Sequence, residues 1–165
     1  MTAHEPLPHK GIHAVEVDAT GLRIALVCAR FNLDITGRLE SGARSALTSR
    51  GAADDDVHTV WVPGALEVPV AANLLARSGR YDAVVGIGAV VRGETYHFEV
   101  VSNESAAGLM RVSLDTGVVV TNGIITVDDM AQALDRVGGA HGHKGAEAAV
   151  AAVETLLAVR AVQAG

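Results

Sequence analysis

Aromatic residues are scarce in this chain of 165 residues, because Phe, Trp and Tyr together make up only 3% of it. Hydrophobic residues nevertheless account for 49% of the sequence, so the core must be built mainly from Val, Leu, Ile, Ala and Gly. Such small side chains let helices approach closely and leave flat apolar surfaces that often need a partner. We therefore expect the chain to form a homo-oligomer.

Cysteine is nearly absent, and the single Cys28 lies within an apolar, strand-like run. One cysteine cannot form an intrachain disulfide, so we expect Cys28 to be a small core residue. A chain without disulfides suits a reducing compartment, and we expect a cytoplasmic protein. The N-terminal stretch lacks the apolar region of a secretory signal, and the apolar run Ala83–Val91 is too short to span a membrane.

An excess of positive charge is also missing, because the formal net charge is −6 and no basic run occurs. This balance argues against a nucleic-acid or membrane-surface binder. The sequence has no GxGxxG, GxxxxGK[ST], CxxC or HExxH motif, so a nucleotide cofactor bound in those familiar ways is not expected. His141 and His143 lie in a predicted loop without Cys or a third ligand, and we expect no metal site there.

Short apolar runs alternate along the chain with segments of helical periodicity. The run Ile35, Leu39, Ala43 and Ala46, for example, lies on one stripe of a predicted helix. Four apolar runs predict strands, and each is followed by turn residues and a helical pattern. The predicted strands are Leu22–Ala29, Val57–Val62, Asp82–Val91 and Val118–Thr121. One predicted helix follows the first strand and ends near Arg50, and the others span about residues 66–78, 98–116, 128–137 and 146–162.

The alternation of strands and helices favours a parallel sheet covered on both sides. Right-handed crossovers then give the α/β class, with a flavodoxin-like doubly wound sheet of four parallel strands and helices on both faces. We expect residues 15–165 to form this single domain, with a short additional strand at Val15–Val17. Residues 1–14, which contain two prolines, are expected to form a flexible arm.

Polar or aromatic residues follow each predicted strand. Phe31 follows the first, Glu67 the second, the loop Arg92–His97 the third and Asn122 the fourth. Because open α/β sheets bind ligands at the carboxyl ends of their strands, we expect these groups to line one site. Three of these four have a plainer interpretation: Phe31 as a core residue, Glu67 as an acid stabilising a helix N-terminus, and the loop as a charged surface turn.

Two cations, Arg136 and Lys144, flank a Gly-rich helix break further along the chain. Two cations beside Gly-rich backbone suit the capture of an anion. A solvated surface pair is the alternative, because nothing in the sequence connects these residues with the strand ends. His58 lies within a predicted strand and is expected to be structural.

Seven segments together resemble the lumazine synthases, the enzymes that make the precursor of riboflavin. The segments follow the family order and nearly the family spacing over residues 22–160, and the block Gly88–Phe98 is especially specific. They are Arg30–Asn32, Pro63–Glu67, Gly88–Phe98, Gly108–Asp115, Asn122–Thr126, Ala133–Arg136 and Lys144–Ala149.

The resemblance implies one reaction, the penultimate step of riboflavin biosynthesis, and no metal or organic cofactor. A 5-amino-6-ribitylaminopyrimidinedione condenses with 3,4-dihydroxy-2-butanone 4-phosphate through a Schiff base. Loss of phosphate and water and closure of the ring then give 6,7-dimethyl-8-ribityllumazine. The resemblance also implies His97 as the proton shuttle, because an imidazole can give and take protons near neutral pH.

The resemblance further implies two groups of binding residues. Phe31 is similar to the aromatic residue that stacks on the pyrimidine, and Glu67 to the acceptor for ribityl hydroxyls. In this family, Asn122, Arg136 and Lys144 reach into the site of the neighbouring subunit, so activity would need the oligomer. The implied pyrimidine and ribityl group comprises Phe31, Ala65, Leu66, Glu67, Val90, Val91 and Asn122, and the phosphate group comprises Gly93, Glu94, Thr95, Arg136 and Lys144.

Three residues depart from the usual family pattern. Asn122 stands where many members carry an aromatic residue, Tyr96 where smaller or polar residues are usual, and His143 where Asn commonly precedes Lys-Gly. These departures predict a changed substrate affinity, but they remove no group that the chemistry needs.

The resemblance implies a pentamer, with a pentamer pair or an icosahedral shell of pentamers as larger forms and riboflavin synthase as a further partner. The short loop between Arg136 and Lys144 favours the shell, and the proline-bearing arm could oppose it. Two other functions are considered: a non-catalytic flavin- or lumazine-binding shell protein, and another phosphate-handling enzyme of the same fold. His97 together with Arg136 argues against the first, and Phe31 together with Glu67 against the second.

Overall fold

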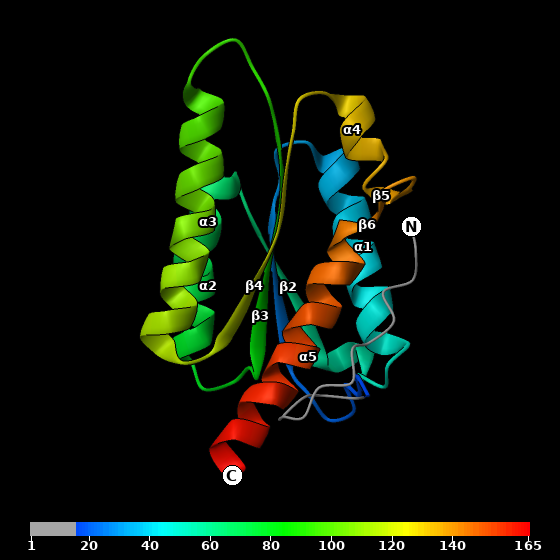
Figure 1. Ribbon diagram of the computed structural model, residues 1–165, viewed down its shortest axis with the longest axis vertical. Helices are drawn as coiled ribbons and strands as arrows, with labels where there is room; N and C mark the ends of the chain where they lie inside the picture. Colours follow the sequence, from blue (N-terminus) through cyan, green and yellow to red (C-terminus); the bar gives the residue numbers. More distant parts are fainter. Residues whose placement is uncertain (1–15) are drawn as a thin grey trace.

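A four-stranded parallel sheet forms the middle layer of the computed structural model, which describes residues 16–165. Its strands lie in the order β2-β1-β3-β4, so that the first and third strands along the chain are central. Every neighbouring pair is parallel, which directs all carboxyl ends toward one edge, at the top of Figure 1. The strands are β1 (Ile24–Ala29), β2 (Val57–Val62), β3 (Ala83–Val91) and β4 (Val119–Val127).

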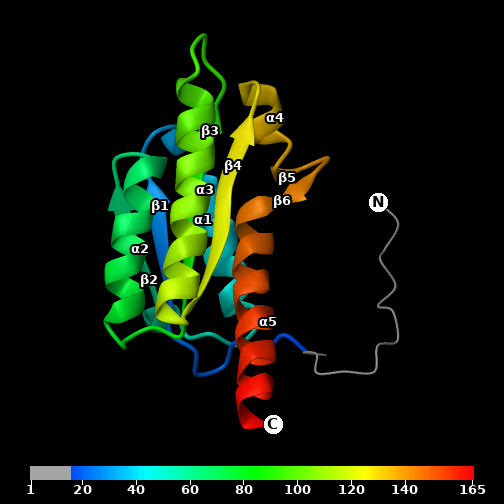
Figure 2. The ribbon, with the colours of Figure 1, turned by 60° about the vertical axis from the view of Figure 1, so that its left-hand side comes forward.

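Helices cover both faces of the sheet. α1 (Leu33–Thr48) and α5 (Lys144–Ala164) lie on one face, and α2 (Val68–Arg77) and α3 (His97–Thr116) on the other (Figure 1). Figure 2 shows β4 at the near edge of the sheet, between α3 and α5. The short elements are the 3-10 turns η1 (Asp54–Asp56) and η2 (Ala65–Glu67), the helix α4 (Met130–Leu134) and the strands β5 (Val137–Gly139) and β6 (Gly142–His143).

The alternation of side chains along β1 builds two cores, one on each face of the sheet. Ile24, Leu26 and Cys28 pack toward α1 and α5, whereas Ala25 and Val27 pack toward α2 and α3. All six residues of β1 are buried, as expected of a central strand between two helical layers. The predicted flavodoxin-like α/β fold is therefore confirmed.

The predicted end of the fourth strand at Asn122 is wrong. Asn122 lies in the middle of β4, where it pairs with Gly86 of β3, and the strand continues to Val127. The Asn-Gly pair does not reverse the chain, because both residues stay paired with β3, and the Asn122 Oδ1 accepts a hydrogen bond from the Ile124 N–H at 2.9 Å. No residue larger than glycine fits at position 123, because a Cβ there would lie 2.8 Å from the Gly86 carbonyl oxygen and 3.1 Å from the Ala148 Cβ.

The segment before the last helix also differs from the prediction. The expected helix over residues 128–137 shrinks to α4, which Asp129 caps by accepting a hydrogen bond from the Gln132 N–H. Val137–Gly139 then pairs antiparallel with Gly142–His143 as a small hairpin, which positive φ angles at Gly138 and Gly142 permit. The sequence predicts a short loop over residues 141–145, but Gly142 and His143 form β6, and α5 begins at Lys144 instead of Ala146.

Two predictions concern the N-terminal part of the chain. The arm over residues 1–14 lies outside the described residues, as does Val15. Glu16 and Val17 are described and do not belong to a strand, so this part of the expected strand Val15–Val17 is wrong. Within residues 16–165, none of the helices combines the length and the apolar character that a membrane crossing requires.

Candidate functional site

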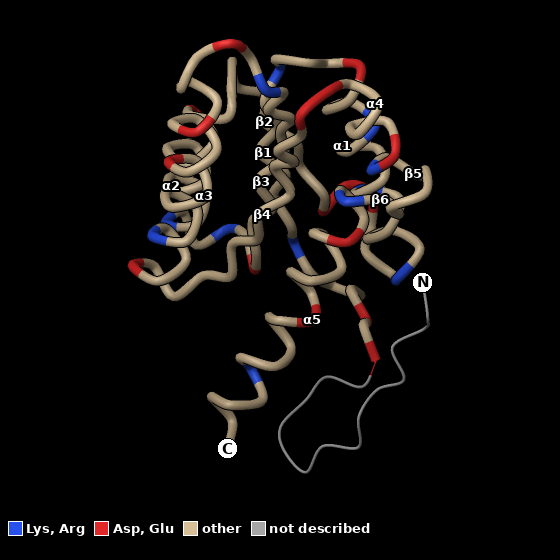
Figure 3. Tube along the Cα trace, turned by 45° about the horizontal axis from the view of Figure 1, so that its top comes forward, with Lys and Arg blue, Asp and Glu red and all other residues tan. Residues whose placement is uncertain are grey.

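A cleft of about 310 Å³ opens at the edge of the sheet where the strands end. Both signs of charge lie along the connections at this edge (Figure 3). The cleft joins the connections that follow β1, β2 and β3, so three separate parts of the sequence meet in it. Its lining comprises Phe31, Asn32, Gly64, Ala65, Leu66, Glu67, Ala89, Val90, Val91, His97 and Val101.

Phe31 presents an aromatic ring to this cleft. Its backbone N–H donates to the Pro63 carbonyl at 3.0 Å, which continues the pairing of β1 with β2 beyond the strand. Asn32 then takes a left-handed conformation with φ 62°, and its Nδ2 donates to the Ala89 carbonyl at 2.8 Å. These bonds hold the turn while the Phe31 side chain stays 67% exposed, so its interpretation as a core residue is wrong.

Glu67 lies beside this ring at the start of α2. Its Oε2 accepts a hydrogen bond from the Gly64 N–H at 2.9 Å, while the Glu67 N–H donates to the Gly64 carbonyl at 3.1 Å. This reciprocal pair ties the carboxylate to the turn that follows β2. Glu67 remains exposed toward the cleft, so it can serve both the turn and a ligand hydroxyl.

His97 is the first residue of α3 and lies on the β3 side of the cleft. Its backbone N–H donates to the Thr95 Oγ1 at 3.4 Å, and its side chain is exposed. Val101 lines the cleft one helical turn later, because residues four apart share a helix face. The imidazole therefore lies on the same cleft as an open aromatic face and a carboxylate.

Arg92 holds the loop that leads to His97. Its Nη1 lies 2.7 Å from the Glu99 Oε1, its Nε lies 2.8 Å from the Asp128 Oδ1, and its guanidinium stacks on the Phe98 ring at 4.2 Å. The hydrogen bonds from Arg92 lower the pKa values of Glu99 and Asp128 and raise the pKa of Arg92 itself. The end of β3 is thereby joined to α3 and to the end of β4.

A second cleft of about 300 Å³ lies along β4 and α5. Asn122 and Lys144 both line it, and the Lys144 Nζ forms an ion pair with the Glu147 Oε2 at 2.8 Å. Arg136 follows α4, is half-buried, and donates from Nη1 to the Gln132 carbonyl at 2.9 Å. These three residues do not line the first cleft of the same chain.

The structure thus sorts the predicted site residues into groups. Seven of them line the first cleft, two line the second, and Arg136 with Gly93, Glu94 and Thr95 lies outside both linings. Gly93, Glu94 and Thr95 form an exposed loop immediately before α3. The seven residues of the first cleft are Phe31, Ala65, Leu66, Glu67, Val90, Val91 and His97.

The sequence analysis did not single out four lining residues: Asn32, Gly64, Ala89 and Val101. Asn32 could have been found, because Asn is one of the few residues that readily adopt a left-handed conformation at a strand–helix turn. Val101 could have been found from its helical spacing to His97. In the described part of the chain, no three His, Cys, Asp or Glu side chains group as a metal site would require.

The chain is also similar to known proteins in sequence. The family model described as 6,7-dimethyl-8-ribityllumazine synthase matches residues 21–160. A curated protein of Gemmatimonas aurantiaca, named 6,7-dimethyl-8-ribityllumazine synthase, is 52% identical to the chain over 136 residues. That match covers 82% of this chain and 83% of the relative.

Proposed function

Because the chain belongs to the 6,7-dimethyl-8-ribityllumazine synthase family, we propose that it carries out the condensation of this family in the cleft lined by Phe31, Glu67 and His97. The predicted family and its enzyme class, a transferase of riboflavin biosynthesis, are confirmed by the match. The reaction joins 5-amino-6-ribitylaminopyrimidinedione and 3,4-dihydroxy-2-butanone 4-phosphate, with release of phosphate and water. The observation that carries the proposal is the convergence of an exposed ring, a carboxylate and an imidazole on one cleft.

The first part of the proposal concerns the pyrimidine. The exposed face of Phe31 stacks on the heterocycle, which contributes about 1 kcal/mol beyond the buried area. The Glu67 carboxylate accepts ribityl hydroxyls, and the turn at Ala65 and Leu66 supplies backbone groups. Val90 and Val91, at the end of β3, form the apolar wall of the heterocycle pocket.

The second part concerns proton transfer at His97. Formation of the Schiff base, elimination of phosphate and ring closure each move protons between heteroatoms. A neutral imidazole can accept a proton at one nitrogen while it donates from the other, so one side chain can serve successive steps. The exposed ring at the start of α3 has access to a substrate in the cleft.

The third part concerns the phosphate and the neighbouring subunit. The exposed loop Gly93–Thr95 offers backbone N–H groups and one hydroxyl, and Arg136 offers a planar, permanently charged guanidinium. Arg136, Lys144 and Asn122 are separated from the first cleft of their own chain, so we propose that they complete the cleft of a neighbouring copy. A ring of five chains gives each first cleft such a neighbour, and the short loop before Lys144 suits a shell of these pentamers.

Two further proposals concern the location of the protein and a partner. A single buried Cys28 suits a cytoplasmic location, since burial raises the pKa of its thiol and keeps it unreactive. Riboflavin synthase is a partner by reaction chemistry, since it would consume the lumazine product.

The direct test is to mix both substrates with the purified protein and to follow lumazine absorbance. Formation of the lumazine with release of one phosphate per product supports the proposal. Absence of product, with tight binding of lumazine or riboflavin, would instead identify a non-catalytic binding protein. The protein's particle size, measured by light scattering in the same preparation, separates a pentamer from a shell.

A further inference from the structure

Gly64 lies against two of the side chains that we assign to pyrimidine binding, those of Phe31 and Glu67. A Cβ built on Gly64 would lie 2.8 Å from the Cδ2 and Cε2 of Phe31 and 3.1 Å from the Oε2 of Glu67. The first distance is shorter than carbon atoms tolerate, so the Phe31 ring rests directly against the Gly64 backbone. The ring and the carboxylate therefore both lie against the side of Gly64 from which a side chain would project.

Gly64 is not required by its backbone conformation. Its φ of −142° and ψ of 179° are extended values that any residue adopts. Its N–H is already engaged with the Glu67 Oε2 at 2.9 Å, and a larger residue would keep that donor. Glycine at position 64 therefore permits the close approach of Phe31, and the turn itself does not require it.

The neighbours of Gly64 differ in their freedom to move. Gly64 itself is buried, and the backbone around it is held by the pairing of Phe31 with Pro63 and of Glu67 with Gly64. The Phe31 ring, in contrast, is 67% exposed and can swing away from an added methyl group. An alanine at this position would displace the ring toward the cleft and leave the fold in place.

We propose that Gly64 is a positioning residue, which sets the distance between the stacking face of Phe31 and the carboxylate of Glu67 and thereby the fit of the pyrimidine. This inference rests on the proposed function of the cleft. It assigns specificity to a residue that does not itself contact the reacting atoms. It predicts that a substitution at Gly64 changes the KM for the pyrimidine and leaves the KM for the phosphorylated substrate nearly unchanged.

The test compares Gly64→Ala with the unchanged protein in steady-state kinetics. We expect the KM for the pyrimidine to rise about tenfold, because an extra methyl group in a fitted pocket weakens binding by about that factor. The kcat and the KM for the butanone phosphate should stay within about threefold of the values of the unchanged protein. The control is Gly37→Ala on α1, where an added Cβ meets nothing within 4 Å. Equal constants for Gly64→Ala and the unchanged protein would overturn the inference.

A double-variant cycle tests whether the effect passes through Phe31. In the Phe31→Ala background, Gly64→Ala should change the KM for the pyrimidine less than about twofold, because the ring that it displaces is gone. An undiminished effect in that background would refute the positioning role. If Gly64→Ala alone fails to fold, the double variant Phe31→Ala, Gly64→Ala should fold, because the clashing ring is absent. A double variant that also fails to fold would refute the contact between Gly64 and Phe31.

Calorimetric titration with the pyrimidine substrate separates this inference from the proposed function. If the unchanged protein binds the pyrimidine without forming product and Gly64→Ala binds it more weakly, the catalytic proposal fails and the positioning role stands. If product forms and both proteins bind the pyrimidine equally, the positioning role fails and the catalytic proposal stands.

Discussion

Arg92 and Asp128 connect the carboxyl ends of β3 and β4, with the Arg92 Nε donating to the Asp128 Oδ1 at 2.8 Å. The Arg92 N–H also donates to the Val127 carbonyl at 2.9 Å, and the guanidinium lies over the Phe98 ring in the first turn of α3. Its second ion partner, Glu99, lies two residues after His97. The position of the proposed proton shuttle is thus linked to the sheet through one side chain.

Replacing Arg92 by alanine should lower kcat, because the start of α3 loses its attachment to β4. Misplacement of a catalytic group by about 1 Å can cost 100-fold, and we expect a decrease of about tenfold with a smaller change in the KM for the pyrimidine. Arg92→Lys keeps one charge and should recover part of the rate. Steady-state kinetics on both variants measure the effect.

The matched control is Arg111→Ala, which removes an exposed ion pair with Asp115 on the same helix. Such surface pairs contribute little, so this variant should retain full activity. Equal rates for the two alanine variants would show that Arg92 has no positioning role.

Acid should loosen the same loop before it unfolds the domain. Arg92 lowers the pKa values of Glu99 and Asp128, so the ion pairs stabilise the fold fully above the ordinary values of about 4. This contribution is lost as the pH falls through the lowered values, because the carboxyls then become neutral. The protection factors of the amides of residues 92–99, which correct exchange rates for their intrinsic dependence on pH, should fall there in the unchanged protein and should be low at every pH in Arg92→Met. Protection factors that do not change with pH in the unchanged protein would contradict this assignment.

The first cleft was largely predictable from the sequence, because parallel strands bring their carboxyl ends together whatever residues lie between them. Phe31, Glu67 and His97 could therefore be placed on one edge from strand order alone. The second group could not be placed in the same way. Asn122 was assigned to a strand end because Asn-Gly usually marks a turn, whereas tertiary packing of Gly123 against Gly86 and Ala148 keeps β4 extended.

Positions that depend on close approach were also hidden from the sequence. A glycine in an extended conformation, such as Gly64, gives no local signal of its contact with Phe31. The hairpin Val137–Gly139 with Gly142–His143 was missed because two glycines were interpreted as a simple helix break. Arg136 follows α4 and does not line the first cleft of its own chain, so strand order alone could not assign it to a site.

Two impaired variants should restore activity to one another if the site is shared between chains. His97→Asn should mainly lower kcat, and Arg136→Ala should mainly raise the KM for the butanone phosphate. In mixed rings formed by co-expression, about one quarter of the first clefts combine an intact His97 with an intact neighbouring Arg136. Activity of the mixture well above the sum of the separate variants, measured by lumazine absorbance, would support the shared site. Activity equal to that sum would place both residues in one chain's own site.

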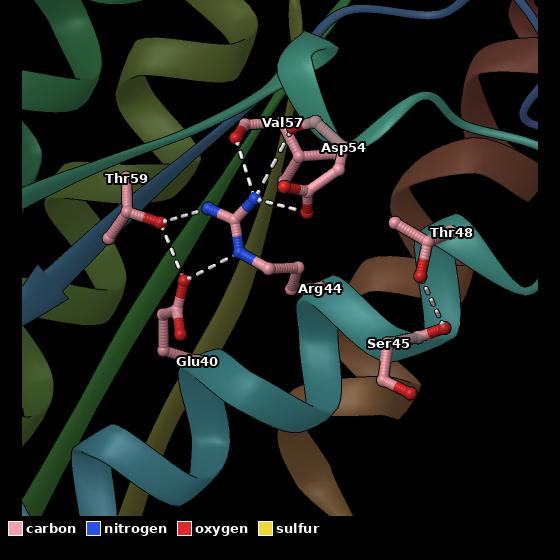
Figure 4. A network of polar contacts seen from close by, with 7 residues as sticks. All are labelled: Glu40, Arg44, Ser45, Thr48, Asp54, Val57 and Thr59. Atoms are coloured by element: carbon pink, nitrogen blue, oxygen red, sulfur yellow. Dashed lines mark hydrogen bonds and ion pairs between the residues drawn. The ribbon is translucent and has the colours of Figure 1, made fainter.

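Arg44 should be important for stability, because it joins α1 to β2 through a part-buried network (Figure 4). Its guanidinium bonds Glu40, Asp54, Thr59 and the Val57 carbonyl. Loss of this donor leaves Glu40, whose side chain is only 17% exposed, without its charge partner. Arg44→Ala should lower the free energy of unfolding by about 2 kcal/mol. Exposed Arg38→Ala on the same helix should stay within about 0.5 kcal/mol in denaturant titrations.

His143 caps α5, the helix that begins with Lys144. Its Nδ1 accepts a hydrogen bond from the Ala146 N–H at 3.2 Å, so the neutral ring carries its proton on Nε2. The ring packs against Gly42 of α1, where an added Cβ would lie 2.6 Å from the same Nδ1. One glycine and one histidine thus join the start of α5 to α1.

His143→Ala should lower the free energy of unfolding by about 1 kcal/mol through loss of the cap, whereas His143→Asn keeps an acceptor and should lose less. Gly42→Ala should act through the same ring, because its new methyl group must push the imidazole from the cap. The two alanine substitutions combined should therefore cost less than the sum of their separate effects. Denaturant titration of the four proteins measures this coupling. Strictly additive effects would mean that Gly42 does not hold the ring. An unchanged stability of His143→Ala would show that the cap does not stabilise the start of α5 at Lys144.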